Sequence, residues 1–273
     1  MKKNKSLLLS APYILWMVVF TLIPLGVVGY YALTDPDTGA FTLGNLKDLG
    51  LYLPVLGSSV GYALISAFIC LLLGYPVAYF IAHCKPVMQK ILYMLVMLPM
   101  CMSFLLRTLA WVGLLETNGI LNGLLGKLHI GPLNMIGTPG AVILGMVYNY
   151  LPYMILPLYA IIVKIDHRLI EAAEDLGCNS LKVFTKVILP LSMPGILSGI
   201  TMVFVPAVST FYISQKLGGT ETMLIGDVIE RQFKSAGNPN LGAALSLVLM
   251  ALVFICTGIM NRFGSDEEGG VVV

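Results

Sequence analysis

The chain has 273 residues, of which 58% are hydrophobic and only 11% carry a charged side chain. Soluble globular domains are closer to a quarter charged, so this composition excludes an ordinary soluble domain. With a mean hydropathy of +0.89, it indicates an all-α, polytopic membrane protein. A net charge of +2 without a basic run gives no support to nucleic-acid binding, and five scattered cysteines predict neither a disulfide framework nor a zinc site.

Six apolar runs are long enough to cross a bilayer, which takes about 20 residues per helix. The first follows three lysines and is too long for a cleaved signal peptide, so we predict a retained signal anchor. Ten Lys and Arg residues fall on the N-terminal side of the membrane and five on the other, which predicts that both termini are cytoplasmic. We therefore expect a single transmembrane domain, 1–273, with spans near 8–33, 56–82, 91–115, 140–163, 191–213 and 242–261.

Glycine pairs four residues apart occur in the second and fifth spans, as Gly57 with Gly61 and Gly195 with Gly199. Such pairs let helix backbones approach closely, and we predict tight helix contacts at both. Arg107 is the one charged residue well inside a run, near enough to the outer end of the third span for its side chain to reach the surface. It is either an anchoring residue or a gate for a cationic substrate.

The fourth and fifth spans contain prolines, hydroxyl groups and tyrosines, a mixture typical of helices that line a cavity. We select four residues as candidates for a substrate path: Tyr148, Tyr153, Ser209 and Tyr212. Tyrosine ring faces can hold a cation without an ion pair. The alternative is packing, with the hydroxyl groups bonded to neighbouring helices or to carbonyls of their own helix.

The loop 164–190 between these two spans reads as helix, tight turn, helix. Asp166 is a good N-cap, and Leu169, Ala173 and Leu176 form an apolar stripe along the first helix. Gly177 then follows, where a left-handed residue would end the helix at little steric cost. By the charge count above, this hairpin is predicted to lie in the cytoplasm.

The same loop resembles a known motif. Glu171-Ala172-Ala173, three residues, Gly177, nine residues and Val187-Ile188-Leu189-Pro190 resemble the EAA loop of bacterial ABC importer permeases, with Val187 in the place of the usual Ile. The resemblance implies the MetI-like permease architecture and a coupling role for Glu171, Ala172, Ala173, Gly177 and Pro190. It also implies the bacterial inner membrane and three kinds of partner: a cytoplasmic ATP-binding subunit acting as a dimer, a second homologous permease, and an extracytoplasmic substrate-binding protein.

Further stretches narrow the resemblance within this family, among them LGYPVAYFIA at 73–82, GMVYNYLPYMILPLYAII at 145–162, FVPAVSTFYISQKLGG at 204–219 and LIGDVIERQF at 224–233. In these stretches the chain most resembles the first permease of spermidine/putrescine importers. This similarity implies polyamine transport, with importers of thiosulfate, ferric iron or molybdate as alternatives.

No catalytic motif is present in the sequence, and His83, His129 and His167 are not at a ligand-like spacing. We therefore expect no cofactor and no metal, and we expect ATP hydrolysis in a partner subunit. An ion-gradient-driven secondary transporter is the other class to consider. Such proteins usually carry acidic residues inside their spans, and here no Asp or Glu lies inside one. A membrane scaffold without transport would not need the EAA spacing.

Overall fold

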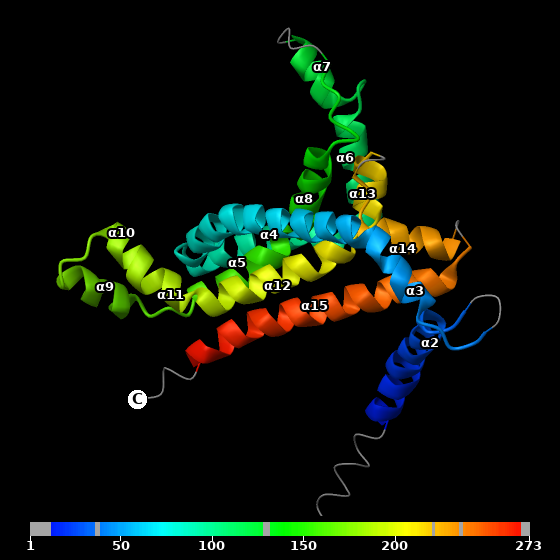
Figure 1. Ribbon diagram of the computed structural model, residues 1–273. Helices are drawn as coiled ribbons and strands as arrows, with labels where there is room; N and C mark the ends of the chain where they lie inside the picture. The colour runs from blue at the N-terminus through cyan, green and yellow to red at the C-terminus, as the bar shows by residue number, and fades with distance from the viewer. Residues whose placement is uncertain (1–11, 36–38, 128–131, 220–221, 235–236, 269–273) are drawn as a thin grey trace, which may run out of the picture. The chain divides into compact units, whose positions relative to one another are not determined.

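The computed structural model describes residues 12–35, 39–127, 132–219, 222–234 and 237–268, and most of them are helical (Figure 1). Among these residues, β pairing is limited to an isolated bridge between Thr34 and Phe41, and the predicted all-α class is confirmed. The elements are η1 (Val18–Leu22), α2 (Ile23–Ala32), α3 (Gly44–Lys47), η2 (Asp48–Tyr52), α4 (Leu53–Ala82), α5 (Pro86–Met97), η3 (Leu98–Cys101), α6 (Phe104–Leu115), α7 (Ile120–Lys127), α8 (Pro139–Ile162), α9 (His167–Asp175), α10 (Ser180–Val183), η4 (Phe184–Ile188), α11 (Leu189–Leu191), α12 (Met193–Ser209), α13 (Tyr212–Leu217), α14 (Ile225–Lys234) and α15 (Pro239–Glu268).

Four helical stretches of the described chain are each long and apolar enough to cross a membrane: Pro12–Ala32, Leu49–Ala82, Pro139–Ile162 and Pro239–Met260. Two bent pairs of helices pass the same test together. These are Pro86–Cys101 with Phe104–Lys127, bent by 88°, and Ser180–Leu191 with Met193–Ser209, bent by 63°. Six spans result if each bent pair counts as one, which agrees with a polytopic membrane protein.

The break between η3 and α6 differs from the single helix predicted over 91–115. Met102 and Ser103 are extended, with ψ values of 149° and 130°. Pro99 lacks the N–H that a continuing helix would donate to the preceding turn, which weakens the helix just before this point. The fifth span is also shorter than predicted, because Thr210 is extended and α13 begins anew at Tyr212.

The chain divides into two compact units, residues 1–54 with 228–252 and residues 55–227 with 253–273. In the first unit the end of α2 packs on the first turns of α15 through Ala32, Ala243 and Ala244. The side-chain amide of Asn240 donates a 2.6 Å hydrogen bond to the carbonyl oxygen of Thr34. This bond satisfies a carbonyl beyond the end of α2, where no helical partner is available.

The second unit has its core where α4, α8 and α12 meet at Met154, which is fully buried. A Cβ atom on Gly74 of α4 would lie 3.1 Å from Met154 Cγ, and one on Gly199 of α12 would lie 2.6 Å from its sulfur. The predicted close contact at Gly199 is confirmed. The corresponding prediction for Gly57 and Gly61 is wrong within this chain, because no described atom lies within 4 Å of either Cβ position.

Candidate functional site

Helix α9 is bounded at both ends by residues that the sequence marks out. The Asp166 carboxylate accepts a 3.0 Å hydrogen bond from the backbone N–H of Arg168, which satisfies a free donor of the first turn. Gly177 has a φ of +83°, and its N–H donates to the carbonyl of Glu174 at 2.8 Å. The next N–H, of Cys178, donates to Ala173 at 3.0 Å, which completes a Schellman motif. The predicted left-handed end of this helix is confirmed.

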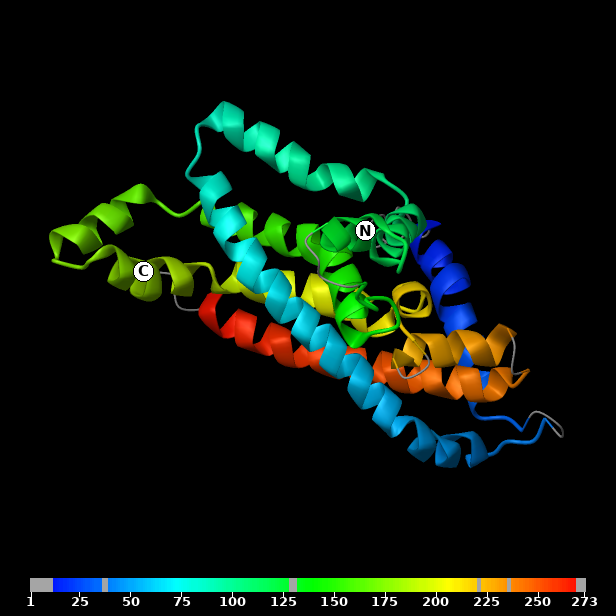
Figure 2. The same ribbon diagram turned by 90° about the horizontal axis from the view of Figure 1, so that it is seen from above.

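The second half of the hairpin runs through α10, η4 and α11. Its first turn is capped by the Asn179 side chain, which accepts a 2.9 Å hydrogen bond from the N–H of Lys182. It ends at Ser192, the residue at the 63° bend into α12, and exposed Pro190 lies just before that bend. Figures 1 and 2 show the hairpin projecting beyond the ends of α4 and α12.

Three leucines of the hairpin have apolar side chains that the described chain does not cover. Leu169 is 49% exposed, Leu176 is 86% exposed and Leu181 is 70% exposed. Exposed Glu171 and Ala172 lie on the same short helix as the first of them. Large apolar side chains exposed on a projecting element are typical of a docking site for another protein.

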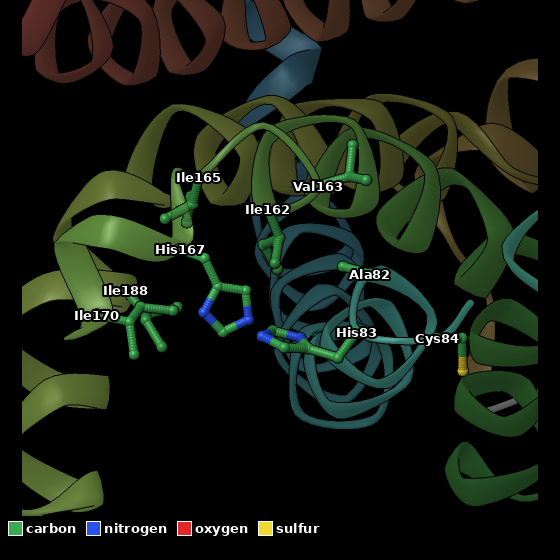
Figure 3. A pocket seen from close by; sticks show the side chains of 9 residues that line it. All are labelled: Ala82, His83, Cys84, Ile162, Val163, Ile165, His167, Ile170 and Ile188. Carbon is green, nitrogen blue, oxygen red and sulfur yellow. The ribbon is translucent and has the colours of Figure 1, made fainter. Parts of the chain in front are cut away.

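A cavity of about 230 Å³ lies between the hairpin and the ends of α4 and α8. The rings of His83 and His167 meet edge-on beside it, with centroids 5.9 Å apart, and Figure 3 shows the thiol of Cys84 pointing away from them. The described residues contain no group of three or more His, Cys, Asp or Glu that could hold a metal. Besides the two histidines, the lining consists of Ala82, Cys84, Ile162, Val163, Ile165, Ile170 and Ile188.

All three candidate path tyrosines have contacts with other aromatic rings. Tyr148 on α8 meets Trp111 of α6 edge-on, with centroids 5.3 Å apart. Tyr212, the first residue of α13, lies 6.2 Å from the ring of Phe104. The ammonium of Lys216 lies 5.9 Å from the Tyr212 ring centroid, so a cation already occupies one face of that ring.

The other two candidates lie elsewhere on α8 and α12. Half-buried Tyr153 has its ring 6.4 Å from that of Tyr150, whose hydroxyl donates to the carbonyl of Pro206 at 3.3 Å. Ser209 is exposed, and its hydroxyl donates to the carbonyl of Val205 in its own helix. Tyr148 and Tyr153 are five residues apart, which places them on different faces of α8. The structure therefore does not bring the four candidates into one cluster.

Arg107 does not reach the surface, contrary to the prediction. Its side chain is 7% exposed, and neither Nε nor Nη1 has a hydrogen-bond partner among the described residues. Arg107 is close enough to Tyr150 for the two side chains to interact electrostatically. Helix α6 packs against α8 and α13, and Arg107 is buried on this helix, whereas Leu105, Leu106 and Leu109 are exposed on it.

Comparison with known proteins then decides the family. Residues 72–265 match the family described as "Binding-protein-dependent transport system inner membrane component". The chain belongs to this family of ABC importer permeases.

Relatives and solved structures agree with this assignment. The permease is 40% identical over 243 residues to the spermidine/putrescine transport system permease protein PotB of Escherichia coli (strain K12), a match that covers 86% of the chain and 88% of the relative. Its fold matches that of a bacterial ABC transporter involved in the import of the acidic polysaccharide alginate, with a TM-score of 0.77 and 17% identity over 97% and 99% of the two chains. A second structure is that of a bacterial alginate ABC transporter in complex with alginate pentasaccharide-bound periplasmic protein. It matches with a TM-score of 0.75 and 17% sequence identity, and the match covers 95% of this chain and 94% of the other.

Sequence reasoning missed two features of the permease. The first is the contact between His83 and His167, which are far apart in the sequence and whose spacing does not predict it. The second is the row of aromatic rings at the end of α4, which the sequence does indicate, because Tyr75, Tyr79 and His83 at steps of four lie on one face of a helix.

Proposed function

We propose that this permease forms one half of the translocation path of an ATP-driven importer of polyamines such as spermidine and putrescine. The main support for polyamines as the substrate is the 40% identity to a spermidine/putrescine permease, in a match that covers 86% of the chain. The absence of Asp and Glu from the predicted spans supports the same substrate, since a carboxylate in the path would hold a polycation tightly.

The partners that we propose are a cytoplasmic ATP-binding subunit acting as a dimer, a second homologous permease and an extracytoplasmic substrate-binding protein. The projecting hairpin with its exposed leucines supports docking on the ATP-binding subunit. Ten basic residues against five support placing the hairpin and both termini in the cytoplasm. In this arrangement the permease itself is not an enzyme.

Uptake in proteoliposomes tests the substrate. The permease is reconstituted with the three partners encoded in the same cell, and ATP-dependent accumulation of radiolabelled spermidine is measured beside thiosulfate, ferric iron and molybdate. We expect accumulation of spermidine that requires ATP and the binding protein. Accumulation of one of the other solutes, with no uptake of polyamines, would refute the substrate assignment.

Docking of the hairpin is tested through Leu176 and Leu181. Replacing both by Ser removes apolar contact area from an interface core, and we expect about tenfold weaker association with the ATP-binding subunit, measured by co-purification at graded concentrations. Leu106→Ser is the matched control, because Leu106 is 61% exposed on α6, outside the hairpin. If the wild type, the double Ser variant and Leu106→Ser all associate equally with the ATP-binding subunit, Leu176 and Leu181 lie outside the interface.

For the substrate path we propose Tyr153 and Tyr212, with Tyr148 and Ser209 as further candidates. The support is chemical, because a ring face holds a cation with about 0.5–2 kcal/mol, weak enough for release. Tyr→Leu at each of the two positions should lower spermidine uptake while the complex assembles and hydrolyses ATP at its basal rate, and Tyr→Phe should do much less. Normal uptake by both Leu variants would make these tyrosines packing residues.

A further inference from the structure

Three aromatic side chains lie on one face at the end of α4, two within the helix and one, His83, directly after it. Tyr75, Tyr79 and His83 follow at steps of four residues, so they lie one above the other along the helix. Tyr79 and His83 are in close contact, with ring centroids 4.1 Å apart, and His83 Nδ1 lies 2.8 Å from the carbonyl oxygen of Tyr79. This end of α4 therefore presents a connected series of rings.

Phe184 of the hairpin packs against two of these rings. Its ring meets Tyr75 edge-on at 5.5 Å with an interplanar angle of 86°, and meets Tyr79 at 6.3 Å with an angle of 83°. Edge-to-face contacts are the favoured arrangement of aromatic pairs and fix orientation as well as distance. Phe184 thus packs against two rings of α4 and helps to hold the second half of the hairpin on that helix.

The first half of the hairpin reaches the same face by a different contact. His167, the first residue of α9, meets His83 at 5.9 Å, with ring planes at 81°. Next to this pair lies the cavity of about 230 Å³, so apolar packing between α9 and the end of α4 is incomplete (Figure 3). The contact between the two imidazole rings joins α9 to the end of α4.

At its other end the series reaches the bend between α11 and α12. Ser192 is fully buried, and its hydroxyl donates to the carbonyl of Leu189 at 2.9 Å. The Tyr75 hydroxyl lies 2.9 Å from Ser192 Oγ. Because the single hydroxyl proton of Ser192 is engaged by Leu189, Tyr75 is the donor of this bond.

We propose that the aromatic row, defined as Tyr75, Tyr79, His83, Phe184 and His167, transmits movement of the hairpin to α4 and to the bend at Ser192, and so positions the spans when ATP is hydrolysed. The row connects both halves of the hairpin with the residue at which α12 changes direction. This inference rests on the proposed docking of the hairpin on an ATP-binding subunit. Its residues act through other groups, and none of them is placed in the substrate path.

The test compares transport with hydrolysis in the reconstituted complex. Spermidine uptake and ATP hydrolysis are measured in the same proteoliposomes for Tyr79→Leu and Phe184→Leu. We expect the spermidine transported per ATP hydrolysed to fall about fivefold or more, while the binding protein still stimulates hydrolysis. Tyr79→Phe keeps the ring and should retain the wild-type ratio. The double Leu variant should lose no more than the larger single loss, because both residues belong to one connection.

Phe80→Leu is the matched control, since Phe80 is on the same helix, next to Tyr79, and is 64% exposed. If the Leu variants do not assemble, Tyr75→Phe and Ser192→Ala test the proposal in their place. Each deletes one hydroxyl group of the 2.9 Å hydrogen bond with little change in side-chain volume. We expect each to lower the ratio about twofold.

The proposal is overturned if the ratio stays at the wild-type value in every assembled variant, or if Phe80→Leu lowers it equally. Failure of the proposed function would look different. In that case the wild-type complex itself would accumulate no spermidine, or the ATP-binding subunit would not co-purify.

Discussion

Gly177 sets the geometry of the hairpin turn through its own backbone. Its φ is +83°, and nothing lies within 4 Å of the place where a Cβ would be, so a side chain there meets backbone strain and no clash. A non-glycine residue in this region costs about 1–3 kcal/mol, most for a β-branched one. We expect Gly177→Val to abolish uptake while membrane insertion, measured by the amount of protein in washed membranes, stays normal.

A control for this change is available in the same chain. Gly39 has a φ of +65° and equally open surroundings, so Gly39→Val imposes similar strain outside the hairpin. Gly177→Asn should retain most uptake, because Asn tolerates the left-handed region better than other non-glycine residues. Wild-type uptake by Gly177→Val would show that the turn is not needed for coupling.

Arg107 is a buried charge whose Nε and Nη1 have no partner among the described residues. Such a charge destabilises the folded chain, whereas a Met keeps the length of the stem without the charge. We expect Arg107→Met to raise the unfolding free energy of the purified permease by roughly 1–3 kcal/mol. The readout is the thermal unfolding midpoint in detergent, with Leu106→Met, at an exposed neighbour, as the control. A lowered midpoint would mean that the guanidinium is stabilised in the fold.

At the scale of elements, α9 divides into a covered and an uncovered side. Ile170 lines the cavity, whereas Glu171 and Ala172 are exposed, as is Leu176 directly after the helix. Glu171→Lys reverses a charge at the proposed interface and leaves the caps at Asp166 and Gly177 untouched. We expect about tenfold weaker association of the ATP-binding subunit, and no change in the affinity of the binding protein for substrate.

Association of the ATP-binding subunit is measured by titrating it against the purified permease at two salt concentrations. The loss should be smaller at high salt, since exposed charges are screened there. Glu116→Lys, which reverses an exposed charge at the end of α6, controls for the change in net charge. A complex that purifies intact and still responds to the binding protein would exclude Glu171 from the interface.

At the scale of the whole molecule, the packing of α4, α8 and α12 depends on two glycines around one methionine. Adding a methyl group to Gly199 would place it 2.6 Å from Met154 Sδ, whereas Gly57 of α4 has no described atom within 4 Å. Gly199→Ala should therefore destabilise the permease by about 1–3 kcal/mol through overpacking. Gly57→Ala should stabilise it by about 0.5–1 kcal/mol, since Ala favours a helix over Gly.

Both Gly→Ala variants are compared with the wild type by thermal unfolding of the purified permease. The same substitution is thus measured at a crowded position, Gly199, and at an open one, Gly57. A stabilised Gly199→Ala would mean that Met154 moves aside easily and that this contact does not set the helix distance. A destabilised Gly57→Ala would mean that α4 has a close neighbour at that turn.

The sequence by itself determined the features that depend on local chemistry. Long apolar runs predict membrane helices because every backbone group must find a partner within its own segment. The caps of α9 are equally local, since Asp166 and Gly177 act on N–H and C=O groups within a few residues of themselves. The family resemblance at the hairpin rested on the same local residues.

Only the tertiary structure decided which side chains from distant segments meet. It broke the predicted third span between Cys101 and Phe104, and turned Arg107 inward where the sequence predicted an outward side chain. It brought His167 onto His83 and placed Phe184 between Tyr75 and Tyr79. Local propensity contains no information on these contacts, because in lipid all apolar faces of a helix are nearly equivalent and the choice among them is made by packing against neighbouring helices.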